Sequence, residues 1–99
     1  MIEVTDKEFQ EKVLKRSLKT PVVVDFWASY CIPCKILAPI LERLEKDYRG
    51  KFVLAKICIE DNKETAKTYE VMSIPSVKMI KNGKTVAEFT GAIPEEVVK

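Results

Sequence analysis

Hydrophobic residues gather in two nearly continuous runs, at positions 22–27 and 52–59. Both runs are rich in β-branched, aliphatic and aromatic residues and lack polar alternation. This pattern is typical of strands that are covered on both faces, as in a parallel sheet. The short segment 2–4 favours a further strand, at a sheet edge.

Apolar residues at helical spacing predict one helix before the first run and another between the two runs. Thr5 and Glu8 fit a capping box at the start of the first helix, which we expect to end near Ser17. The second helix is expected over about 34–49, with Gly50 as its stop.

The last third of the chain predicts a short helix and a hairpin. Asp61 or Asn62 is expected to cap the helix. The strands 77–81 and 85–89 flank an Asn-Gly pair, which is a strong hairpin signal. A last helix is expected to start at residue 94.

The expected order is β-α-β-α-β-α-β-β-α in one domain spanning residues 1–99. Early crossovers predict parallel strands, and the late hairpin predicts an antiparallel edge. We therefore expect the α/β class, with a central mixed sheet and helices on both of its faces.

Charge and composition exclude several classes of partner. The net charge is +2, from 17 basic and 15 acidic residues that are well mixed, which is no footprint for nucleic acid. The start, MIEVTDKEF, does not resemble a signal peptide, and no apolar run is long enough to cross a bilayer. We expect a cytoplasmic protein that binds neither nucleic acid nor membrane.

The segment WASYCIPCK carries the candidate chemistry, because Cys31 and Cys34 follow a strand and open a helix. A thiolate is the nucleophile in disulfide exchange, and the free N–H groups of a first helical turn stabilise it. Pro33 lacks an N–H but suits a first turn, so the Cys34 amide is the expected donor. We expect Cys31 to be the exposed attacker and Cys34 to lie one turn deeper.

Proton transfer requires another group, because the chain has no histidine. Asp25 interrupts an apolar strand and is the leading candidate, since burial raises a carboxyl pKa toward neutrality. Lys56 interrupts the other apolar strand and is expected to be its ionic neighbour. The alternative is that Asp25 only forms a structural pair with Lys56.

A metal site is the less favoured interpretation of the cysteines. Zinc needs about four ligands, and Cys58 is the one further thiol in the chain. We therefore expect no bound metal or cofactor, and Cys58 is interpreted as a small buried hydrophobic residue.

Several motifs in this order and spacing resemble the thioredoxin family over nearly the whole chain. They are Val24-Asp25-Phe26-Trp27-Ala28, Cys31-x-Pro33-Cys34-Lys35, Ala38-Pro39, Ala55-Lys56, Ile74-Pro75, Asn82-Gly83 and Gly91-Ala92. The resemblance implies the thioredoxin fold and a protein disulfide reductase that serves electron transport and cell redox homeostasis. An NADPH-dependent thioredoxin reductase would recharge it.

The resemblance also implies roles for individual residues. Cys31 would be the nucleophile, Cys34 the resolving cysteine, and Asp25 the proton-transfer group beside Lys56. Substrate would meet a surface formed by Trp27, Ile32, Pro33, Ile74, a cis-Pro75 and Gly91. The backbone of Ile74 would bind the substrate by strand addition.

Three positions depart from the family pattern. Ile32 replaces a usual glycine, Tyr30 a usual tryptophan, and Cys58 a commonly polar residue. These changes leave the choice of partners open. The alternatives are a disulfide oxidase or isomerase, a glutaredoxin-like protein, and a non-catalytic binding module. A monomer is expected.

Overall fold

The structure is a computed structural model that describes residues 1–91. It contains a five-stranded sheet in the order β1-β3-β2-β4-β5. The strands are β1 (Ile2–Glu3), β2 (Val22–Trp27), β3 (Val53–Cys58), β4 (Ser76–Lys81) and β5 (Lys84–Thr90). β3 is parallel to β1 and β2, whereas β4 is antiparallel to both β2 and β5. The predicted mixed sheet is therefore confirmed.

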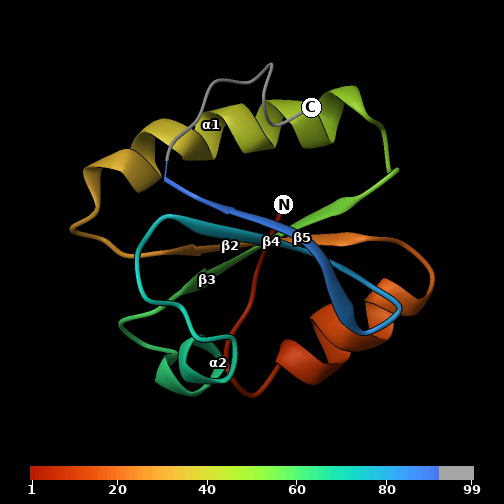
Figure 1. Cartoon of the computed structure of the whole chain (residues 1–99). Coiled ribbons are helices and arrows are strands. Elements are labelled where there is room, and N and C mark those ends of the chain that lie inside the picture. Colours follow the sequence, from red (N-terminus) through yellow and green to blue (C-terminus); the bar gives the residue numbers. More distant parts are fainter. Residues whose placement is uncertain (92–99) are drawn as a thin grey trace.

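Helices cover both faces of this sheet. The helical segments are η1 (Gln10–Lys15), η2 (Arg16–Leu18), α1 (Ile32–Asp47) and α2 (Lys63–Thr68). Figure 1 shows α1 on one face, and α2 and the N-terminal helical segment on the other. The predicted α/β class is confirmed, and the expected helix at residue 94 lies outside the described residues.

Two buried clusters, one on each side of β2, hold these layers together. Val22, Val24 and Phe26 belong to the cluster that includes Phe9 and Val13 of the N-terminal helical segment. Successive strand residues point to opposite faces. The other cluster accordingly joins Val23 of β2 to residues of α1, namely Leu37 and Leu41. Burial on both faces explains the continuous apolar run of β2.

The first helix differs from the expected regular helix. It is a π-helix over Gln10–Lys15 that continues into a 3₁₀ turn. The buried Ser17 hydroxyl donates to the Leu14 carbonyl at 2.6 Å and accepts the Gly83 N–H at 2.9 Å. A serine that binds helix carbonyls competes with the regular ladder. The helix end is thereby joined to the hairpin turn, a contact that local spacing does not predict.

The capping box at the start of this helix forms only in part. The Glu8 carboxylate accepts the Thr5 N–H at 3.2 Å, as expected. The Thr5 hydroxyl, however, donates to the same carboxylate oxygen at 3.0 Å.

The cap of α2 is a correction to the prediction. Asn62 occupies the N-cap position, but its side chain makes no capping hydrogen bond. Asp6 caps the helix instead, because its carboxylate accepts the backbone N–H groups of Glu64 at 3.3 Å and Thr65 at 2.9 Å. The Asn62 side chain is engaged elsewhere, accepting the Asp6 N–H at 2.8 Å.

The remaining boundaries agree with the predictions to within two residues. α1 begins at Ile32 rather than at residue 34, because Pro33 fits the first helical turn. The hairpin turn is formed by Asn82 and Gly83, with φ values of 53° and 77°. Positive φ at both positions is what a type I′ turn requires.

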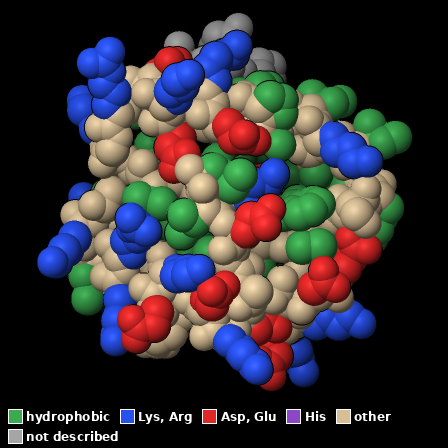
Figure 2. Space-filling view, turned by 180° about the vertical axis from the view of Figure 1, so that it is seen from behind, with side chains coloured by type: hydrophobic (Ala, Val, Ile, Leu, Met, Phe, Trp, Pro, Cys, Tyr) green, Lys and Arg blue, Asp and Glu red, His purple; other side chains and the backbone are tan. Residues whose placement is uncertain are grey.

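Acidic and basic side chains are interspersed on the face of the molecule that Figure 2 shows. This distribution agrees with the nearly balanced charge of the sequence. Within residues 1–91, the helices are too short or too polar to span a bilayer.

Candidate active site

Cys31 and Cys34 lie at the junction between β2 and α1 and are joined in a disulfide. Cys31 is the N-cap of α1, with extended backbone angles, and Cys34 follows in the first turn. Their Cα atoms are 5.3 Å apart, and the Cys34 N–H donates to Cys31 Sγ at 3.2 Å. The predicted placement of the pair and its predicted amide donor are both confirmed. A helix N-terminus with this amide favours negative charge on Cys31.

The expected exposure of Cys31 is wrong for this disulfide form. Cys31 is 6% exposed and Cys34 is 2% exposed, so both sulfurs are largely covered. The physical reason is packing, since both cysteines form a buried cluster with Ala28 against which Trp27 and Ile74 pack.

Asp25 lies in the middle of β2 and is 1% exposed. Neither carboxylate oxygen has a hydrogen-bond partner in the described structure. Burial raises the pKa of Asp25 to about 6, although the charge of Lys56 opposes this shift and Glu42 adds to it. Alternation along β2 puts Asp25 on the α1 face of the sheet with Val23. The buried acid is therefore on the same side of the sheet as the cysteine helix.

Lys56 pairs in register with Asp25 across β2 and β3, but the two side chains form no ion pair. The Lys56 ammonium lies 5.1 Å from the ring centroid of Trp27, within the range of a cation–π contact. The direct bond expected in the alternative, a structural pair of Asp25 and Lys56, is therefore not formed in the described structure. Lys56 acts on Asp25 through its charge, not through a direct bond.

The segment before β4 lies against the cysteine pair. The Ile74–Pro75 peptide bond is cis, as the resemblance implied, and Ile74 packs against the cysteine cluster. The Pro75 carbonyl accepts the Gly91 N–H at 2.9 Å, which joins this segment to the end of β5. Gly91 has a φ of 84°, a conformation that favours glycine, and a Cβ there would meet open space.

Glu60 is a residue of this site that the sequence reasoning missed. Its carboxylate accepts the Ser29 N–H at 2.6 Å and lies 3.6 Å from the Cys58 thiol. The bond from Ser29 holds the pKa of Glu60 below its ordinary value. The polar run after β3 was a usable signal, because the carboxyl ends of the parallel strands β2 and β3 meet at one edge of the sheet.

Cys58 also differs from its prediction. It is half-buried and unpaired rather than enclosed in the core. Cys58 is the last residue of β3, and with Trp27 and Lys56 it lines a surface hollow. The strand ends there, so the apolar layers that cover its middle no longer enclose it. Within residues 1–91, no three His, Cys, Asp or Glu side chains are grouped to hold a metal ion.

Comparisons with known proteins agree with this geometry. The thioredoxin family model matches residues 1–99. The chain is 43% identical to a thioredoxin of Chlorobaculum thiosulfatiphilum over 96 residues, which cover 97% of this chain and 87% of the relative. It is likewise 43% identical to a thioredoxin of Buchnera aphidicola, over 100% of this chain and 90% of the relative. A thioredoxin of Rickettsia bellii is 48% identical over 82% of this chain and 75% of that protein.

Proposed function

The chain belongs to the thioredoxin family, and from that premise we propose that it catalyses reduction of disulfide bonds in other proteins. The observation that carries the proposal is the Cys31–Cys34 disulfide at the N-terminus of α1. The two cysteines form a redox-active pair, and they lie at a helix end that stabilises a thiolate. The same placement distinguishes the pair from two cysteines buried for packing alone.

The reaction proceeds by two exchanges. In the reduced protein, the Cys31 thiolate attacks one sulfur of the substrate disulfide, and the other substrate sulfur leaves as a thiolate. The Cys34 thiol then loses its proton and attacks Cys31 Sγ, which releases the second substrate thiolate. The substrate gains two electrons and two protons, and the protein is left with the Cys31–Cys34 disulfide.

Asp25 is proposed as the group that accepts the Cys34 proton. Its burial and raised pKa support this role, because a carboxyl with a pKa of about 6 exchanges protons readily near neutrality. Lys56 supports the ionised form through its positive charge. The position of Asp25 on the α1 face of the sheet also favours the role.

Substrate is proposed to bind as an added strand at Ile74. Among the described residues, the N–H and carbonyl of Ile74 have no hydrogen-bond partner, so both are available to an extended peptide. Trp27 and Pro75 would support the peptide from below, and Gly91 would flank it. Ile32, 69% exposed beside Pro33, would meet it from the α1 side.

The partners follow from the same reaction. We propose that a thioredoxin reductase, supplied by NADPH, returns the disulfide to the dithiol, and that the protein works in the cytoplasm. It is proposed to act as a monomer and as one domain, which is supported by the completeness of the cysteine site within one chain.

The test is catalysis of insulin reduction by dithiothreitol. We expect the wild-type chain to accelerate precipitation of the insulin chains, and the Cys31→Ser/Cys34→Ser double variant to leave the uncatalysed rate. A wild-type chain without effect would exclude the reductase and favour a binding module. The measured reduction potential separates a reductase from an oxidase, because an oxidase has a much higher potential.

A further inference from the structure

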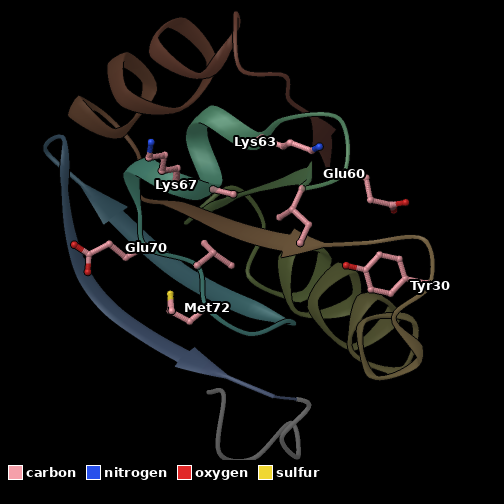
Figure 3. A pocket seen from close by; sticks show the side chains of 9 residues that line it. Tyr30, Glu60, Lys63, Lys67, Glu70 and Met72 are labelled. Atoms are coloured by element: carbon pink, nitrogen blue, oxygen red, sulfur yellow. The ribbon is translucent and has the colours of Figure 1, made fainter.

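A groove of about 680 Å³ begins at Tyr30, next to the nucleophilic cysteine, and runs along α2. Figure 3 shows its lining, with Tyr30 and Met72 on different elements and the lysines of α2 along another side. The groove is open to solvent, and neither Cys31 nor Cys34 is among the residues that line it.

Apolar side chains form much of the groove. Ile59 and Val71 line it and pack against the core. Tyr30 and Met72 are 70% and 92% exposed, so they present apolar area that the fold itself does not bury. Exposed apolar area of this kind favours contact with a partner.

The basic side chains of the groove are available to bind a ligand, whereas its acidic side chains are engaged or directed elsewhere. Lys63 and Lys67 lie four residues apart on α2, and so on one face of the helix, and both are exposed without an ion-pair partner in the described structure. The Glu60 carboxylate is engaged by the Ser29 N–H. Glu70 lies beyond the end of α2, and Figure 3 shows its carboxylate directed away from the lysines.

We propose that this groove binds the residues flanking the reactive cysteine of a disulfide substrate, and that it selects segments carrying an acidic and an apolar side chain. The carboxylate would pair with Lys63 or Lys67, and the apolar side chain would lie between Tyr30 and Met72. Because Lys63 and Lys67 are both positively charged and unpaired, they attract an acidic residue beside the substrate cysteine and repel a basic one. The inference rests on the proposed reductase function and names its substrate class.

Two activated peptides test this selection. They are Glu-Leu-Cys-Leu-Glu and Lys-Leu-Cys-Leu-Lys, each carrying 4-thiopyridine in a mixed disulfide on its cysteine. Cys31 attacks the peptide sulfur, and 4-thiopyridone leaves and is measured by absorbance. Cys34 then releases the peptide thiol. Charges on both sides of the cysteine make the result independent of the direction in which the peptide binds.

The reduced wild-type chain should react at least about fivefold faster with the acidic peptide at low ionic strength, because its glutamate can pair with Lys63 or Lys67 whereas the lysine of the basic peptide is repelled by both. The preference should decline as salt is added. The Lys63→Glu/Lys67→Glu variant should prefer the basic peptide instead. The matched control is Lys81→Glu/Lys84→Glu, which changes the net charge equally at the hairpin end of β4, away from the cysteines, and should keep the wild-type preference.

Equal rates for the two peptides in the wild type, or a preference that both double variants change alike, would overturn the groove inference. The neutral disulfide 4,4′-dithiodipyridine distinguishes this failure from failure of the proposed function. If the chain reacts with 4,4′-dithiodipyridine at a normal rate but shows no preference between the peptides, the groove inference alone is refuted. Absence of any reaction with it contradicts the exchange chemistry as well.

Discussion

At Asp25, a carboxylate is enclosed in the sheet without a hydrogen bond, and this makes folding sensitive to its ionisation. Its pKa rises from 3.8 to about 6 in the folded protein, mainly through desolvation. The folded state therefore binds the proton more tightly than the unfolded state. This contribution to stability is fully present below pH 3.8 and is lost as the pH rises through about 6.

Asp25→Asn should consequently stabilise the oxidised protein at pH 8 more than at pH 4. A shift of this size corresponds to a difference of about 2–3 kcal/mol in the free energy of unfolding between the two pH values. Urea unfolding at both values measures it, with Asp47→Asn on the exposed end of α1 as control. An equal effect of Asp25→Asn at both values would show that the carboxyl is not buried as described.

The same variant should slow catalysis while leaving the fold intact. Loss of a positioned proton acceptor should reduce the rate of insulin reduction by about tenfold or more near neutral pH. The control is the Asp47→Asn variant in the same assay. Wild-type turnover of Asp25→Asn across pH 6–9 would exclude the proton-transfer role.

At the scale of elements, α2 depends on a side chain distant in the sequence. Asp6 accepts two N–H groups of the first turn of α2 and the Thr65 hydroxyl. Desolvation raises the pKa of Asp6, but these three bonds together outweigh it and hold the pKa below its ordinary value. Asp6→Ala should therefore lower the free energy of unfolding by about 1–2 kcal/mol, as loss of a cap does.

Asp61→Ala is the matched control, because Asp61 was a candidate cap from the sequence and is exposed in the structure. Its effect should stay within about 0.5 kcal/mol. Urea unfolding of both variants decides the matter. A larger loss at Asp61 than at Asp6 would contradict the described cap.

These elements also show what the sequence could and could not predict. The strands β2 and β3 and the helix α1 were predicted, because burial on two faces and helical spacing are local patterns. The α2 cap and the irregular first helix were not, because they depend on partners across the fold. Asp6 lies 59 residues from Thr65, and Ser17 lies 66 residues from Gly83.

For the whole molecule, the site is assembled from four segments of the chain. The cysteine pair could be predicted because its two members and its helix are adjacent in the sequence. Asp25 and Lys56 were found because each is a charge in an apolar strand, and the sheet register then brings them together. Glu60 and the groove along α2 were missed, because they become visible only when the β2 and β3 loops meet.

Ile32 is expected to affect partner choice rather than the redox equilibrium. It is the first residue of α1 and 69% exposed, so its side chain reaches the surface and adds no charge near Cys31. Ile32→Gly should shift the reduction potential by less than about 30 mV, a tenfold change in equilibrium. Rates with a reductase and two protein substrates should change more.

Equilibration with a glutathione buffer gives the potential of both proteins, and stopped-flow kinetics gives the rates. A potential shift well above that bound, with unchanged partner kinetics, would reverse the interpretation of Ile32.

The central claim is that Cys31 attacks the substrate and Cys34 resolves the intermediate. Its most direct test is mass spectrometry, under non-reducing conditions, of Cys34→Ser, Cys31→Ser and wild type after reaction with a protein disulfide. A mixed disulfide should accumulate on Cys31 of the Cys34→Ser variant, should not form on the Cys31→Ser variant, and should be only transient in the wild type. A substrate adduct on Cys34 or Cys58 of the Cys31→Ser variant, with none on Cys31 of Cys34→Ser, would contradict it.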